Sequence, residues 1–246
     1  IPITLDVSEQ FASQLQPGSH VALRDPEGVM LATLEVEEIY KPDRHAEAEA
    51  VYGPTDEVHK GVWHLLRQTQ PVCLSGRLRG LQMPQHYDFV SLRLSPAEIR
   101  REFARVGWRR VVAFQTRNPL HRAHEYALVY GLETLLRQGL NAGACLNPLI
   151  GETKGDDVHA DVRMHTYESL IQTRSLGDGD SDASLWGPRG ESVPDRVILL
   201  GLDIKMFYGG PKEAIMHAIY RQNFGFTDID RQSTRLNSSH GQLSRM

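Results

Sequence analysis

Short runs of apolar residues, separated by turns, fill residues 1–94 of the chain. Alternating or clustered β-formers between Gly, Pro and Asp residues are typical of strands joined by turns. The stretches predicted to be strands are 1–7, 20–25 and 29–40. The stretch 71–82 resembles a further hairpin, and two short helices are predicted at 42–53 and 60–68. The first third of the chain is therefore predicted to be a small β-rich domain.

The pattern changes at residue 95. Ser95 and Pro96 suit the N-cap and first position of a helix, and Glu98 completes a capping box with Ser95. The apolar spacing predicts a helix to about Val106, ended by Gly107.

A strand–helix–strand pattern follows directly. Residues 108–115 form a short continuous apolar run, as in strands buried in parallel sheets. The turn TRNP leads into a helix predicted from Pro119 to about Gln138, and a second strand is predicted at 142–151. This spacing indicates a βαβ unit. A further strand and helix are predicted at 195–204 and 211–225, so the second part of the chain is α/β.

Two segments lack apolar periodicity. Residues 172–194 are rich in Gly, Ser and Asp and are predicted to be an irregular insertion, with Arg174, Trp186 and Arg189 in solvent. Residues 232–246 form a polar tail that looks non-native, and His240 in it has no assigned role. The predicted domains are 1–94 and 95–231. Because IPITLDVS reads as a strand already under way, we expect the first domain to be truncated at its N-terminus.

Composition narrows the function classes. The 246 residues are 40% hydrophobic and 24% charged with a net charge of −4, which argues against a nucleic-acid binder. No apolar run approaches the ~20 residues of a membrane span, and no signal peptide is visible. Cys73 and Cys145 each lie inside an apolar run, which favours reduced buried thiols and a cytoplasmic location.

The turn between the first strand and helix of the βαβ unit has the composition of an anion site. With Asn118 as N-cap and Pro119 at the first helical position, the free N–H groups of the helix and its positive dipole end lie at the edge where strands end. His121 and His124 are three residues apart and share a helix face, and Arg117 adds a planar cation suited to oxyanions.

Other interpretations of this pattern exist. A His-x-x-His pair on a helix is often structural, and a zinc site with Glu125 as a third ligand is a weaker alternative. The chain has no Walker A loop and no G-x-G-x-x-G run, which argues against the usual kinase and dinucleotide sites.

The run QTRNPLHRAHE at 115–125 resembles the Gln-x-Arg-Asn-Pro-x-His-x-x-His motif of ATP sulfurylases. The resemblance extends through HYDF at 86–89, GETKGDD at 151–157 and YGGPKEAIMHAIYRQNFG at 208–225. It implies a PUA-like β-rich N-terminal domain, followed by a Rossmann-like, HUP-type nucleotidyltransferase domain with a parallel sheet. The second domain is then truncated at its C-terminus.

The resemblance also implies an activity. ATP sulfurylases form adenylyl sulfate (APS) and pyrophosphate from ATP and sulfate, by direct in-line attack of sulfate on the α-phosphate. Mg²⁺ accompanies the ATP, and no protein-bound metal is expected. The implied catalytic positions are Thr116, Arg117, Asn118, His121 and His124. The implied ATP contacts are the same residues with Gln115, and Gln115 and Arg117 also contact sulfate. Lys154 is a further candidate phosphate contact.

The chain departs from the family after Thr227. The family continues into a strand and a Gly-Arg-Asp-His-Ala-Gly loop that binds ATP and sulfate from the other side, whereas this chain reads DIDRQSTRLNSSH. We therefore expect this fragment to be weak or inactive, and its interrupted strand to leave an unpaired sheet edge. Two alternatives stay open: a non-catalytic nucleotide- or anion-binding remnant, and a nucleotidyltransferase of the same fold with another acceptor. A homo-oligomer and a fused adenylyl-sulfate kinase domain in the parent protein are also open.

Overall fold

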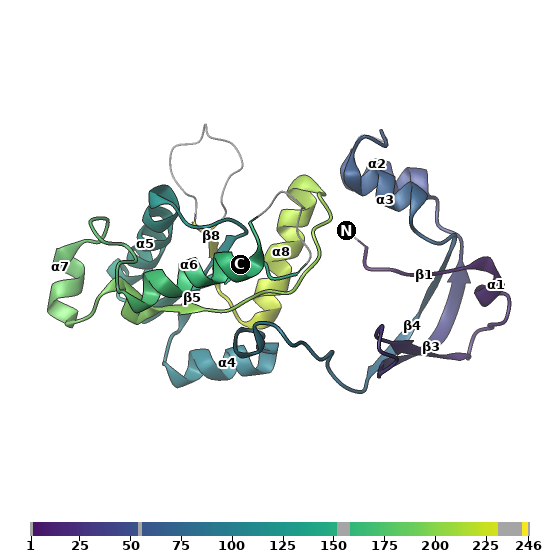
Figure 1. Cartoon of the computed structure of the whole chain (residues 1–246), viewed down its shortest axis with the longest axis horizontal. Coiled ribbons are helices and arrows are strands. Elements are labelled where there is room, and N and C mark those ends of the chain that lie inside the picture. Colours follow the sequence, from purple (N-terminus) through teal and green to yellow (C-terminus); the bar gives the residue numbers. More distant parts are fainter. Residues whose placement is uncertain (1, 54–55, 152–157, 231–242, 246) are drawn as a thin grey trace. The chain divides into compact units, whose positions relative to one another are not determined.

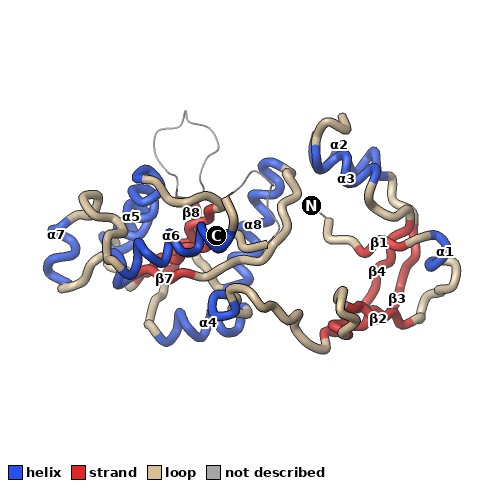
Figure 2. The backbone as a smooth tube through the Cα atoms, viewed as in Figure 1, coloured by secondary structure: helices blue, strands red, loops and turns tan. Residues whose placement is uncertain are grey.

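The computed structural model describes residues 2–53, 56–151, 158–230 and 243–245. The chain divides into two compact units, residues 1–87 with 207–216 and residues 88–206 with 217–246. The division falls within one helix, α8 (Gly210–Phe224). Figures 1 and 2 trace the elements of both units.

The first unit contains a four-stranded antiparallel sheet in the order β1-β4-β3-β2. Its strands are β1 (Leu5–Val7), β2 (His20–Arg24), β3 (Met30–Tyr40) and β4 (Val72–Gly80). Its helices before α8 are α1 (Glu9–Ala12), α2 (Arg44–Tyr52) and α3 (Lys60–Arg67). The predicted β-rich domain and both predicted short helices are confirmed. Cys73 of β4 and Cys145 of the second unit are buried free thiols, as predicted.

The predicted hairpin at 71–82 is wrong. This stretch is the single strand β4, which pairs along its length with β3 and also with β1. Gly76 faces a bulge in β3 between Val36 and Glu38, where a Cβ on Gly76 would overlap the backbone carbonyl of Glu35. The glycine therefore serves a close approach of two strands rather than a turn.

The second unit contains a five-stranded sheet in the order β7-β6-β5-β8-β9. Its strands are β5 (Arg110–Thr116), β6 (Ala142–Pro148), β7 (Val197–Leu199), β8 (Asp228–Asp230) and β9 (Leu243–Arg245). All neighbouring pairs are parallel except β8 with β9. The predicted α/β parallel sheet is confirmed. The expected unpaired edge after Thr227 is wrong, because β8 pairs with β5 on one side and β9 on the other.

The helices of the second unit are α4 (Pro96–Arg105), α5 (Arg122–Arg137), α6 (Ala160–Gln172) and α7 (Ala183–Trp186), with 3-10 turns η1 (Val90–Leu92), η2 (Gly187–Arg189) and η3 (Val193–Arg196). The capping box predicted for α4 is present. The Ser95 hydroxyl accepts from the Glu98 backbone N–H, and the Glu98 carboxylate accepts from the Ser95 backbone N–H at 2.8 Å.

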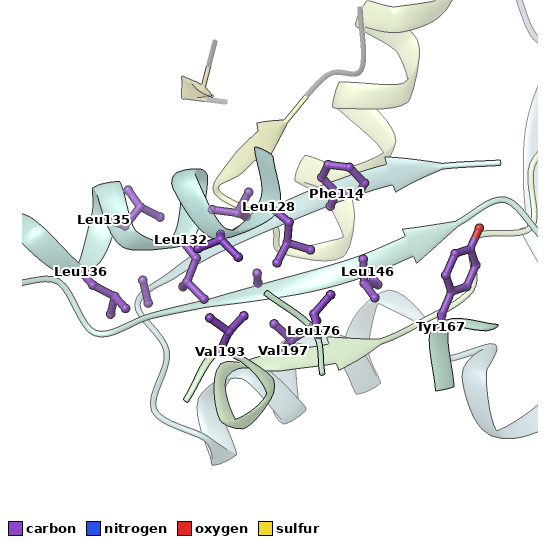
Figure 3. Packing of buried hydrophobic residues seen from close by; sticks show 14 of the residues in the cluster. Phe114, Leu128, Leu132, Leu135, Leu136, Leu146, Tyr167, Leu176, Val193 and Val197 are labelled. Carbon is purple, nitrogen blue, oxygen red and sulfur yellow. The ribbon is translucent and has the colours of Figure 1, made fainter. Parts of the chain in front are cut away.

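Strand β5 separates two hydrophobic clusters, because alternate side chains of a strand point to opposite faces. Val112 and Phe114 join a large cluster with α5 and β6, shown in Figure 3. Val111 and Ala113 point to a second cluster, with α4. The α4 residues in that second cluster are Ile99 and Phe103. The sheet is thus covered on both faces, as a parallel sheet requires.

The prediction that Trp186 lies in solvent is wrong, although residues 172–194 contain little regular structure beyond α7 and short 3-10 turns. Trp186 is only 4% exposed and belongs to the large cluster, together with Leu176 and Val193. Its indole N–H donates to the buried carboxylate of Glu133 at 2.8 Å. Arg174 and Arg189 are exposed, as predicted. The apolar residues of this segment are widely spaced along the sequence, yet Leu176, Trp186 and Val193 all join the same cluster.

Candidate anion site at the carboxyl ends of β5 and β6

The motif residues lie where two adjacent parallel strands end. Gln115 pairs in register with Asn147, and Thr116 pairs with Pro148. Helix α5 starts a few residues after β5 and returns along the sheet. Ligands of open α/β sheets bind at this edge.

Helix α5 starts later than predicted. It begins at Arg122 with His121 as N-cap, rather than at Pro119 with Asn118 as N-cap. His121 has an extended backbone (φ −125°, ψ 169°), and its carbonyl accepts from the N–H groups of His124 and Glu125. Asn118 and Pro119 therefore belong to the turn before the helix, and no side chain caps the first turn of α5.

The backbone of Asn118 explains the later start, because it is held in the turn by two hydroxyls. The buried Thr116 hydroxyl donates to the Asn118 carbonyl at 2.8 Å and accepts from the Asn118 N–H at 3.2 Å. The Tyr167 hydroxyl donates to the same carbonyl at 2.7 Å. These bonds leave the Asn118 side chain exposed at the edge of the sheet.

The two motif histidines stack on each other. Their ring centroids are 3.6 Å apart and their planes differ by 29°. His121 is exposed, whereas His124 is half-buried and packs near Phe114. Burial, with a smaller contribution from His121, lowers the pKa of His124 to about 4. His124 is therefore neutral at pH 7, and within the described chain its Nδ1 is buried without a hydrogen-bond partner.

Of the remaining predicted site residues, Gln115 and Arg117 are described by the structure and Lys154 is not. Gln115 and Arg117 are half-buried; Gln115 is the second-last residue of β5 and Arg117 follows the strand directly. Lys154 lies outside the described residues, as does His240. The structure thus brings Gln115, Arg117, Asn118, His121 and His124 to one edge of the sheet, with Thr116 holding their turn.

Three buried polar residues beside Gln115 were missed by the sequence analysis. His217 and Arg221 of α8 are 3% and 0% exposed, and Asn147 of β6 is 1% exposed. The Gln115 amide nitrogen lies 2.8 Å from His217 Nδ1. The sequence does contain a sign that His217 and Arg221 lie together, because they are four residues apart on a predicted helix and therefore share one face.

The described residues contain neither a cluster of metal ligands nor a helix suited to a membrane. No three His, Cys, Asp or Glu side chains there gather as a metal site would require. Glu125, the third ligand of the zinc alternative, is buried and accepts from the Gly177 N–H at 3.2 Å. In the same residues no helix is both long enough and apolar enough to cross a bilayer.

Stability is expected to fall as the pH is lowered from about 6.5 to about 4. Burial lowers the pKa of both His124 and His217 from 6.5 to about 4 in the folded chain, so the unfolded chain binds more protons across this window. Above pH 6.5 both histidines are neutral in the folded and in the unfolded chain, so they no longer make stability depend on pH. Urea denaturation at pH 7.5 and pH 5 measures the difference. His124→Gln should reduce the pH dependence, and an unchanged dependence in that variant would contradict the assignment.

Comparisons with known proteins agree with the two units. A model of the PUA-like domain matches residues 1–83, and a model of ATP-sulfurylase matches residues 90–229. The chain is 43% identical over 230 residues to a sulfate adenylyltransferase of Pyropia yezoensis, covering 92% of this chain and 55% of the relative. It is 42% identical over 225 residues to a probable bifunctional SAT/APS kinase 2 of Sorangium cellulosum, covering 92% of this chain and 35% of the relative.

A solved structure is also similar. The hexameric APS kinase from Thiobacillus denitrificans aligns with a TM-score of 0.61 and 26% identity, covering 94% of this chain and 37% of that chain. Fold and matches together define a PUA-like β domain followed by a parallel-sheet α/β domain. The chain belongs to the ATP-sulfurylase family. It spans about half the length of the Pyropia relative.

Proposed function

We propose that this chain is the ATP- and sulfate-binding part of a sulfate adenylyltransferase, which converts ATP and sulfate into adenylyl sulfate and pyrophosphate. The observation that supports the proposal most directly is the gathering of Gln115, Arg117 and the stacked His121–His124 pair at the carboxyl end of β5. Donors and a fixed cation at this edge suit two polyanionic substrates.

The chemistry of the reaction suits these residue types. Sulfate is a dianion at neutral pH, so its attack on the α-phosphate needs no general base. The barrier arises because the sulfate dianion must approach the negatively charged triphosphate. Positioned hydrogen-bond donors and cations lower that barrier. Arg117 and the Gln115 amide bind sulfate, while His121, His124 and the Asn118 amide contact the α- and β-phosphates. Lys154 adds a phosphate contact.

Mg²⁺ is expected to arrive with ATP. The described motif residues at this edge offer amide, imidazole and guanidinium groups, and the buried carboxylate of Glu125 accepts from the Gly177 N–H. These groups suit the phosphates rather than the metal, whose charge offsets that of the nucleotide. The reaction is proposed to take place in the cytoplasm, in line with the two buried free cysteines.

Assembly remains a prediction. The name of the Sorangium relative includes an APS kinase, and the similar solved structure is described as hexameric. The first name agrees with a fused kinase domain in the parent protein, and the second agrees with a homo-oligomer.

The proposed function is tested by pyrophosphate release with and without sulfate. The 246-residue chain is expected to release little, because donors are needed on both sides of the phosphates and the family's second loop does not follow Thr227. A chimera of residues 1–227 with the corresponding C-terminal part of the Pyropia relative should release pyrophosphate only with sulfate. Tight ATP binding by the chimera without sulfate-dependent release would instead favour a non-catalytic remnant. Equal rates for chain and chimera would contradict the two-sided site.

A further inference from the structure

A chain of buried polar groups lies directly behind the anion site. Gln115 at the end of β5 contacts His217 of α8, with 2.8 Å between the amide nitrogen and Nδ1. Arg221, one turn further along α8, donates from Nη1 to the His217 carbonyl at 3.1 Å and from Nη2 to the Asn147 carbonyl at 3.4 Å. Asn147 is the register partner of Gln115 on β6. The three elements β5, β6 and α8 thus meet at this chain of groups.

The Gln115–His217 contact defines which imidazole nitrogen carries the proton. An amide nitrogen can only donate, so His217 Nδ1 must accept and the ring proton must reside on Nε2. A doubly protonated imidazole could not accept this bond. The contact therefore exists only with neutral His217.

The surroundings of His217 keep it neutral. Burial, aided by the positive charge of Arg221, lowers the pKa of His217 to about 4. Arg221 is fully buried and makes no ion pair with any described residue. Cys145 lies close enough to influence Arg221 electrostatically, but burial raises the pKa of its thiol, which is neutral. At neutral pH the positive charge of Arg221 therefore opposes protonation of the His217 ring.

One amide hydrogen of Gln115 is used by His217, which leaves a second N–H and the carbonyl oxygen. Because the bond to His217 restricts rotation of the amide, the direction of the second N–H is also restricted. We propose that His217 is a positioning residue, which holds the Gln115 amide so that its second N–H donates to an anionic substrate at the end of β5. This inference rests on the proposed function and names a residue outside the motif at 115–125.

Preorganisation of this kind has a measurable energetic effect. A donor that is already aimed loses less side-chain freedom when the ligand binds, so a free Gln115 amide should bind an anion more weakly. A charge-assisted hydrogen bond from an aimed donor is stronger than a neutral one, and its loss weakens binding by about tenfold.

The proposal is tested on the 246-residue chain with sulfate and pyrophosphate as probes. His217→Leu removes the acceptor and should weaken the affinity for both ions by about tenfold. His217→Asn is the matched control, because its amide oxygen can take the place of Nδ1, and it should retain the affinity within about threefold. Calorimetric titration measures the affinities, and thermal melting reports whether each variant is folded. Equal affinities for His217→Leu and the unchanged chain would overturn the proposal.

A spectroscopic measurement needs no variant. In ¹⁵N-labelled protein, the two imidazole nitrogens of His217 should show the tautomer protonated on Nε2, unchanged between pH 8 and pH 5. Sulfate should shift the Gln115 side-chain amide resonances. A proton on Nδ1, or amide resonances that do not respond to either ion, would overturn the positioning role. If the chain binds both ions as described but the chimera shows no sulfate-dependent release, the proposed function fails while the positioning role stands.

Discussion

Replacing Arg117 with Ala is expected to reduce sulfate-dependent pyrophosphate release by the chimera by about 30- to 1,000-fold, corresponding to about 2–4 kcal/mol of transition-state stabilisation. Arg117 is the one arginine within the run 115–121, directly after β5. Its planar guanidinium can form two parallel hydrogen bonds to a tetrahedral oxyanion, and both are lost with the side chain. Initial rates at saturating ATP and varied sulfate measure the effect on kcat and KM.

Two further substitutions make the Arg117 result specific. Arg117→Lys keeps the charge but loses the paired donors of the planar guanidinium, so its rate should also be well below that of the unchanged chimera. Arg101→Ala removes an exposed arginine from α4 and should leave the rate unchanged. Near-normal turnover in both Arg117 variants would mean that sulfate binds elsewhere.

Trp186→Ala is expected to lower the free energy of unfolding by about 3–5 kcal/mol. The indole is 4% exposed in the large hydrophobic cluster, and its N–H donates to Glu133 at 2.8 Å. The substitution leaves a cavity and removes a donor from a buried carboxylate, and the two effects add. Urea denaturation followed by circular dichroism measures the change.

The matched control for Trp186 lies three residues away. Arg189 is exposed in the same segment, so Arg189→Ala should change the free energy of unfolding by less than about 0.5 kcal/mol. Similar small effects for both substitutions would show that residues 172–194 contribute nothing to the core of the second unit.

Elements whose causes are local could be predicted from the sequence. The helix α4 depends on Ser95, Pro96 and Glu98, which act within one turn, and both sides of its capping box are present. The buried strand β5 was recognised because residues on both its faces are apolar. The motif histidines were placed together because a spacing of three residues shares a helix face.

Features that depend on distant partners were missed. The start of α5 is later than predicted because Asn118 is held in the turn, in part by the hydroxyl of Tyr167, which lies 49 residues further along than Asn118. Trp186 is buried on Glu133, 53 residues away, in a segment whose own pattern is polar. The role of β4 as one long strand depends on Glu35 in β3. None of these partners could be read from the neighbouring sequence.

The pairing of β5 with β8 has a consequence for synthesis of the protein. Val112 pairs with Asp228, and Arg110 forms an ion pair with the buried Asp228 carboxylate across 118 residues. Thr227 also accepts from the Val111 N–H at 2.8 Å. A ribosome must therefore release almost the entire described chain before the central strand acquires its second neighbour. Until then the nascent polypeptide presents a half-paired β5, the stage at which chaperones would be needed most.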